Sequence, residues 1–186
     1  KGLVCMRSSG NIYNISLMAS VLEVTGAEGA ADWAKGVASN FARDPQSNDT
    51  GQIRAVASGE CKVSIANTYY IGRLLASEKP EDEAVIEGIR VVFPNQSDRG
   101  THVNISGAGV VASAPNKENA IKFIEYLTSD EAQRIFAEGN NEYPVIGEAT
   151  GPISTLGSFT EDQISASILG IRQKEAVELF DQAGWL

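Results

Sequence analysis

Short apolar runs alternate with amphipathic stretches along this chain, and the alternation predicts strands separated by helices. A short apolar run bounded by turn residues is typical of a buried strand. Five such runs predict strands, at residues 3–7, 61–66, 89–93, 101–105 and 109–112. Strands that alternate with helices are typical of an α/β fold with a mostly parallel sheet flanked by helices.

The amphipathic stretches space their apolar residues three or four positions apart, which is the spacing of one helix face. In the clearest case Ala120, Phe123, Ile124 and Leu127 line a single face. The charged segment 79–83 between two of these stretches is expected to be a loop. The predicted helices begin near residue 12 and then cover residues 27–41, 50–58, 69–77, 116–128, 130–138 and 172–183.

Length and charge limit the classes of function. At 186 residues the chain can bury a sizeable core, and its formal net charge is -9. Nucleic acids and anionic membranes are bound through Lys and Arg, so neither is expected as a partner. The sequence opens directly on a predicted strand and shows no signal-peptide pattern, so we expect a signal peptide and more of the protein upstream.

The two cysteines, Cys5 and Cys61, each lie in a predicted strand. An even pair fits one disulfide in an oxidising compartment. Two buried free thiols, which behave as small hydrophobic side chains, fit equally well. The residues alone leave both alternatives open.

Two strand-to-helix turns carry the candidate chemistry. In α/β sheets, ligands bind beyond the carboxyl ends of strands, where helix N-termini offer backbone N–H groups to anions. One turn covers residues 7–11 and is followed by Tyr13, and the other covers residues 66–68 and is followed by Tyr69 and Tyr70. Three of the five tyrosines of the chain therefore lie at these two helix starts.

Phenolate oxygen is a hard donor that suits a hard, highly charged cation such as ferric iron, and a bound trivalent ion keeps tyrosine deprotonated. Tyrosines at strand ends are more often half-buried packing residues with a solvated hydroxyl. Spacing and composition therefore do not decide between a metal site and ordinary packing.

Longer motifs at these turns and beyond them resemble the bacterial periplasmic ferric-iron-binding proteins of iron ABC importers, most closely the multi-tyrosine, cyanobacterial type. The resemblance covers nearly the whole chain in the order of the family. The motifs that carry it are RSSGNIYN at 7–14, GECKVSIANTYY at 59–70, HVNISGAGV at 102–110, NKENAIKFIEYLTSDEAQ at 116–133 and GNNEYPV at 139–145.

The resemblance implies a two-lobed, Venus-flytrap fold that binds ferric iron between its lobes in the periplasm and delivers it to an inner-membrane ABC permease. By position, Tyr13, Tyr69 and Tyr70 match tyrosine ligands of the family. A bound anion such as carbonate or phosphate would complete the metal shell in some members. The matching anion-side residues are Ser9, Gly10, Asn11, Asn48 and Asn67, with Arg7 expected as a charge partner. An oxidising periplasm favours the Cys5–Cys61 disulfide.

The family's remaining metal ligands come from a first lobe, which would precede Lys1. Residues 1–98 and 151–186 are expected to form the second lobe, and residues 99–150 a crossing segment that returns to the first lobe. Without that lobe, exposed apolar surface would favour a dimer. The only histidine, His102, lies in a motif that matches a hinge strand, and we expect it to be structural.

The alternatives to iron transport are an anion-binding lobe, an enzyme and a sensor domain. A lobe of this fold could bind phosphate, sulfate or an organic anion, but an anion alone has no need of three phenol groups. An enzyme is not expected, since no constellation of nucleophile, base and orienting residue is visible. A sensor domain of the same architecture would need a fused partner.

Overall fold

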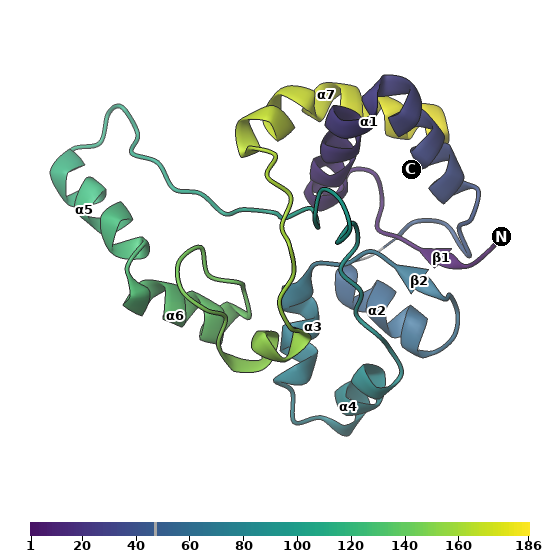
Figure 1. Ribbon diagram of the computed structural model, residues 1–186, viewed down its shortest axis with the longest axis horizontal. Helices are drawn as coiled ribbons and strands as arrows, with labels where there is room; N and C mark the ends of the chain where they lie inside the picture. Colours follow the sequence, from purple (N-terminus) through teal and green to yellow (C-terminus); the bar gives the residue numbers. More distant parts are fainter. Residues whose placement is uncertain (47) are drawn as a thin grey trace. The chain divides into compact units, whose positions relative to one another are not determined.

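The computed structural model describes residues 1–46 and 48–186, and the chain forms two compact units (Figure 1). The first unit contains Lys1–Asn67, Ala84–Asn104 and Phe159–Leu186, and the second contains Thr68–Glu83 and Ile105–Ser158. The lobe boundaries expected near residues 98 and 150 stay predictions. No helix within the described residues combines the length and the apolar character needed to cross a membrane.

A small parallel sheet lies in the first unit. Strands β1 (Val4–Cys5) and β2 (Val63–Ser64) pair with Val4 opposite Val63. Both strands fall inside apolar runs that predicted them, but each is only two residues long. Parallel strands surrounded by helices confirm the predicted α/β class, with a much smaller sheet than expected.

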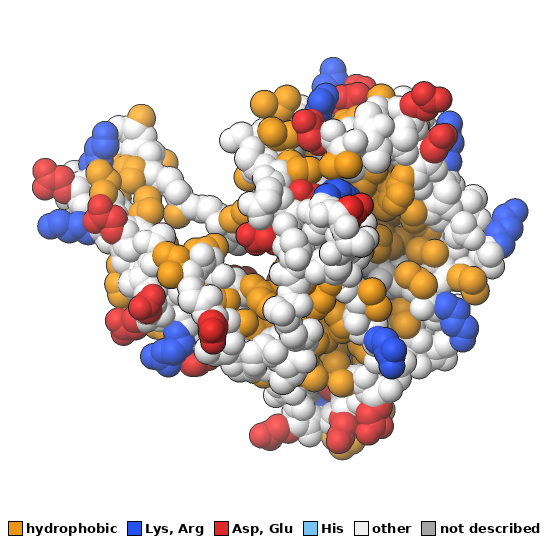
Figure 2. Space-filling view, viewed as in Figure 1, with side chains coloured by type: hydrophobic (Ala, Val, Ile, Leu, Met, Phe, Trp, Pro, Cys, Tyr) orange, Lys and Arg blue, Asp and Glu red, His pale blue; other side chains and the backbone are white. Residues whose placement is uncertain are grey.

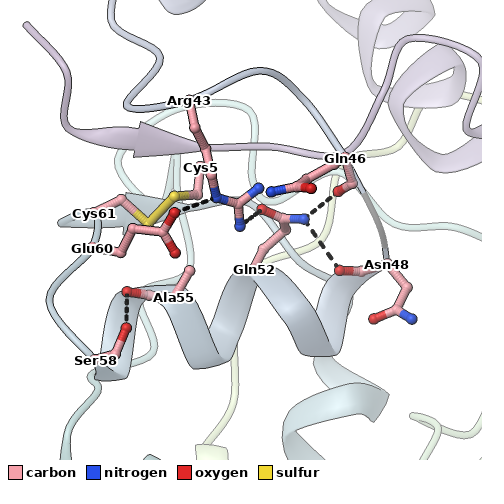
Figure 3. The surroundings of a disulfide bond; sticks show 9 residues. All are labelled: Cys5, Arg43, Gln46, Asn48, Gln52, Ala55, Ser58, Glu60 and Cys61. Carbon is pink, nitrogen blue, oxygen red and sulfur yellow. Dashed lines mark hydrogen bonds and ion pairs between the residues drawn. A yellow bond between two sulfur atoms is a disulfide. The ribbon is translucent and has the colours of Figure 1, made fainter.

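A disulfide joins Cys5 to Cys61 beside this sheet (Figure 3). Helix α2 (Asp49–Ala57) contacts both strands, and Ala55 packs against the disulfide. The guanidinium of Arg43 lies nearby and forms an ion pair of 2.7 Å with Glu60 (Figure 3). The disulfide and α2 therefore hold together two segments that are far apart in the sequence.

Two long helices build the core of the first unit. Helix α1 (Ile12–Ala38) is interrupted at Gly26, whose φ of 71° and ψ of 175° are not helical, so the two helices predicted from residues 12 and 27 are present. Helix α7 (Ala166–Ala183) packs along α1 (Figure 1). After α7 the chain buries Trp185 completely, and its ring contacts Trp33, Phe41 and Phe180.

The second unit contains helices α3 (Thr68–Leu75), α5 (Lys117–Leu127) and α6 (Asp130–Asn140) and the 3₁₀ helix η1 (Gly151–Leu156). Helix α3 packs on η1, and α6 also contacts η1. The close approach of α3 to the end of α6 requires a glycine, because a Cβ on Gly72 would lie 2.5 Å from the Cβ of Asn141. Asn141 ends α6 in a left-handed conformation.

Two predictions about local structure are wrong. The charged segment expected to be a loop begins helix α4 (Pro80–Glu87) instead. Proline suits the first helical position and acidic residues suit the first turn, and Pro80 is followed by Glu81, Asp82 and Glu83. The apolar runs at 89–93, 101–105 and 109–112 form no strands in the described chain. Of these runs, only the second meets a partner, through an isolated bridge between Thr101 and Glu161.

Candidate functional site

The first candidate turn connects β1 to α1 as the sequence predicted. The backbone N–H of Asn11 donates to the carbonyl of Ser8 at 3.2 Å and closes the turn. The side chain of Asn11 then caps α1 by accepting a 3.0 Å hydrogen bond from the N–H of Tyr13. Tyr13 therefore stands in the first turn of a helix whose N-terminus carries a partial positive charge.

The expected anion-binding residues of this turn lie beside Tyr13. Ser9 and Asn11 are half-buried, and Gly10 is exposed. Residues at a helix N-terminus can offer N–H groups to an anion. Binding of an anion by these three residues stays a prediction.

The second candidate turn leads from β2 to α3. Asn67 ends the first unit, and Thr68, Tyr69 and Tyr70 begin α3 in the second unit. The two tyrosine rings are neighbours, with centroids 4.6 Å apart and planes tilted by 40°. The tandem phenols thus lie together at one helix start, and both are half-buried.

Arg73 is a further residue of this site that we did not predict from the sequence. Its guanidinium carbon lies 5.5 Å from the ring centroid of Tyr69 and 5.1 Å from that of Tyr70. The signal was available, because residues three and four positions apart on a helix are neighbours. A cation in this place offsets part of the negative charge that two adjacent phenolates would carry.

Arg7, expected as a charge partner of an anion, has side-chain partners within the first unit. Its side chain is almost fully buried, at 2% exposure, and its Nη1 donates to Oδ1 of Asp49 at 2.7 Å. Its Nη2 donates to the side-chain oxygen of Asn14 at 2.9 Å, and the guanidinium lies 5.4 Å from the ring centroid of Tyr13. The charge of Arg7 is thus paired inside the first unit, and its pairing with a bound anion stays a prediction.

The other two expected anion-binding residues have local partners. Asn48 caps α2, and its side-chain oxygen accepts from the N–H of Gly51 at 3.0 Å. The side-chain oxygen of Asn67 accepts from Nδ2 of Asn104 at 2.9 Å. Both residues belong to the same unit as Ser9, Gly10 and Asn11, and their binding to an anion stays a prediction.

His102 is hydrogen bonded inside the first unit, as expected of a structural histidine. Its Nε2 lies 3.0 Å from Oγ of Ser16, on α1. Burial lowers the pKa of the His102 imidazole from its ordinary 6.5, because burial disfavours the charged form. The negative charge of Asp162 opposes this shift, and the positive charge of Arg99 adds to it.

Comparison with known proteins identifies the family. The model of a family described as bacterial extracellular solute-binding protein matches residues 1–154. The chain belongs to this family. Residues 1–154 include both turns and all three candidate tyrosines, so this solute-binding protein carries its candidate chemistry inside the matched region.

The relatives of this solute-binding protein include iron-uptake proteins. It is 51% identical to iron uptake protein A1 of Synechocystis and 48% identical to iron uptake protein A2 of the same organism, over 100% of this chain in each case. The matches cover 52% and 55% of those two relatives. The chain therefore spans about half the length of the curated relatives that it matches.

A solved structure of a Trichodesmium protein, named IdiA or FutA and in complex with iron and citrate ligands, has the same fold. It superposes with a TM-score of 0.96 at 53% identity, covering 100% of this chain and 60% of that one. These relatives confirm the resemblance to ferric-iron-binding proteins that the motifs predicted, and they confirm the solute-binding-protein fold.

Proposed function

We propose that this chain is the ferric-iron-binding part of a periplasmic receptor that serves an ABC iron importer. The observation that carries the proposal is the tandem of Tyr69 and Tyr70 at the start of α3, with ring centroids 4.6 Å apart and Arg73 over both rings. Two phenol groups at one helix start form a hard donor set, which carries two negative charges when both phenols are deprotonated and so suits a trivalent cation. The similarity to two iron uptake proteins supports the same function.

The phenolates of Tyr13, Tyr69 and Tyr70 are the proposed iron ligands. Tyr13 belongs to the first unit, while Tyr69 and Tyr70 belong to the second. Hinge closure of a two-lobed binding protein around its ligand is a common way to signal that the protein is loaded.

An anion is proposed to complete the metal shell. The residues proposed to bind it are Ser9, Gly10, Asn11, Asn48 and Asn67, of which Asn11 and Asn48 are helix caps. Carbonate, phosphate and a carboxylate such as citrate are all anions, and a helix N-terminus attracts anions. The Trichodesmium relative is described with iron and citrate, which supports an organic anion as a candidate.

The apolar face of α5 is proposed to contact the first lobe of the longer protein. Every side chain of α5 is at least partly exposed in the described chain, including Phe123 at 60% and Tyr126 at 43%. Figure 2 shows hydrophobic side chains at the surface of the segment that carries α5 and α6. Monomeric proteins rarely leave a large apolar patch uncovered, so a first lobe, or a second copy of the chain in a dimer, would bury it.

Two other functions receive less support. Binding of phosphate, sulfate or an organic anion alone would use the helix N-termini but leave the tandem tyrosines without a role. We propose a receptor and not an enzyme, because the named relatives are iron uptake proteins. The permease of an ABC importer is the proposed partner.

Equilibrium dialysis separates the iron and anion proposals. The chain is dialysed against radioactive ferric citrate, and separately against radioactive citrate, phosphate and sulfate without iron. We expect retention of iron with at most one anion per metal, and no retention of any anion alone. Retention of an anion in the absence of iron, at the level seen with iron, would favour the anion-binding alternative.

A further inference from the structure

A buried ion pair in the first unit makes contact with both candidate turns. Arg7 follows β1, and Asp49 is the first residue of α2. Nη1 of Arg7 lies 2.7 Å from Oδ1 of Asp49, and the two side chains are 2% and 0% exposed. The residues are 42 positions apart in the sequence, so the pair is a tertiary contact.

On one side, Arg7 holds the turn that precedes Tyr13. Its Nη2 donates to the side-chain oxygen of the fully buried Asn14, and the Nδ2 of Asn14 donates back to the carbonyls of Arg7 and Ser8 at 3.0 and 2.9 Å. The guanidinium also lies 5.4 Å from the ring centroid of Tyr13. Arg7 therefore contacts a proposed iron ligand and fixes the backbone of the turn that carries it.

On the other side, Asp49 holds Asn67, the residue that directly precedes α3. Its Oδ1 accepts a 2.7 Å hydrogen bond from the backbone N–H of Asn67 and a 3.4 Å hydrogen bond from the side-chain Nδ2 of the same residue. Asn67 is followed directly by α3, whose first turn contains Tyr69 and Tyr70. One carboxylate oxygen thus bonds to Arg7 and to the start of the second turn.

Stability alone does not account for a pair in this place. Removing two charges from water is costly, and replacing a buried ion pair by apolar residues often leaves stability unchanged or increases it. Within the described residues, Oδ2 of Asp49 and Nε of Arg7 are also buried without a hydrogen-bond partner. A buried polar atom without a hydrogen bond carries a desolvation cost, which reduces what the pair contributes to stability.

We propose that Arg7 and Asp49 are a positioning pair for the iron ligands: within the first unit they hold the turn that carries Tyr13 and they hold Asn67, which directly precedes α3. This inference rests on the proposed iron site, because it assigns the pair a role toward the metal donors. Residues that orient metal ligands contribute to affinity even when they do not touch the metal, and their loss typically weakens binding about 10- to 100-fold.

The variants are chosen so that folding and positioning can be told apart. Asp49→Asn leaves Arg7 as an unpaired buried charge and is expected to destabilise the fold, whereas the double variant Arg7→Gln/Asp49→Asn removes both charges together. Asp162→Asn is the matched control. Its carboxylate is also buried and forms a 2.6 Å ion pair with Arg99, but it contacts Ser20 and neither candidate turn.

Amide hydrogen exchange tests the positioning in the metal-free protein. In the double variant we expect faster exchange in both segments 8–14 and 66–70, with unchanged exchange in α7. In Asp162→Asn the two segments are expected to exchange as in wild type. Unchanged exchange in either segment of the double variant, or a uniform increase along the whole chain, would overturn the proposed positioning.

Ferric citrate titration of the same proteins tests the consequence for iron. The double variant is expected to bind iron about 10- to 100-fold more weakly and with a displaced tyrosinate absorption band, while Asp162→Asn retains the wild-type band. A wild-type band and affinity in the double variant would overturn the role of the pair. Absence of a band in wild type, both with and without the proposed first lobe attached, would instead overturn the proposed iron site and with it the metal role of the pair. The exchange data would still decide whether the pair holds both turns.

Discussion

The rings of Tyr69 and Tyr70 lie with their centroids 4.6 Å apart at the start of α3, although consecutive residues on a helix diverge by about 100°. The guanidinium of Arg73 lies over both of these neighbouring rings. Two phenolates in contact would repel each other, and a cation beside them reduces that cost.

Replacing Arg73 by Met should therefore weaken ferric-iron binding about two- to fivefold, since a cation–π contact at an exposed site contributes about 0.5–1 kcal/mol. Arg73 is exposed, so the fold should be unaffected. Arg73→Lys keeps the charge and is expected to retain most of the affinity. The measurement is competition with citrate for iron, and equal affinity of Arg73→Met and wild type would show that the cation has no role.

Gly72→Ala should destabilise the second unit by about 1–3 kcal/mol, because the new Cβ would lie 2.5 Å from the Cβ of Asn141. Gly170→Ala is the matched control. It also lies in a helix, and a Cβ there meets nothing within 4 Å, so it should stabilise α7 by about 1 kcal/mol. Urea unfolding followed by circular dichroism measures both changes, and equal effects of the two substitutions would contradict the packing of α3.

Reduction of the Cys5–Cys61 disulfide should lower the free energy of unfolding by about 4 kcal/mol. The bond joins residues 56 positions apart, and a closed loop of this length restricts the unfolded chain. Urea unfolding with and without a reductant gives the difference. The variant Cys5→Ala/Cys61→Ala, which should show no response to reductant, is the control.

His102 should make the stability depend on pH. Because burial lowers the pKa of the folded imidazole from 6.5, the unfolded state binds the proton first as pH falls. The contribution of His102 to the free energy of unfolding is therefore fully present above pH 6.5. It declines as pH falls below 6.5, and the decline ends once pH is below the pKa of the folded imidazole. Urea unfolding at a series of pH values, about pH 5 to 8, should show this slope in wild type and a smaller slope in His102→Gln.

Helix periodicity made most of the fold predictable. The residues at 116–128 and 130–138 predicted α5 and α6 to within two residues, and the break near residue 27 corresponds to Gly26. Three predicted strands are wrong because a strand needs a hydrogen-bonded neighbouring strand, and an apolar run by itself does not show whether such a neighbour exists. These runs lie at 89–93, 101–105 and 109–112. The charge of residues 81–83 favours a loop when the sequence is considered alone, but acidic residues after Pro80 also suit the first turn of a helix, which is what α4 forms.

The candidate site was predictable where its signal is local. Tyr13 and the tandem tyrosines lie at helix starts, which the preceding turn residues indicate in the sequence. The position of Arg73 beside the tandem tyrosines could be inferred from its helical spacing of three and four residues. The partner of Arg7 was not predictable. Asp49 lies 42 positions away, with no local pattern linking the two residues, so Arg7 was expected to be available to an anion.

The visible absorption spectrum after addition of ferric citrate tests the central claim most directly. It is recorded for the chain and for Tyr69→Phe/Tyr70→Phe, which keeps both rings and removes both donors, each with and without the proposed first lobe attached. We predict a tyrosinate-to-iron charge-transfer band, orange to purple in colour, in the wild-type protein and its loss in the variant. A band of equal strength in the variant, or no band in either form of the wild-type protein, would contradict iron binding through these phenolates.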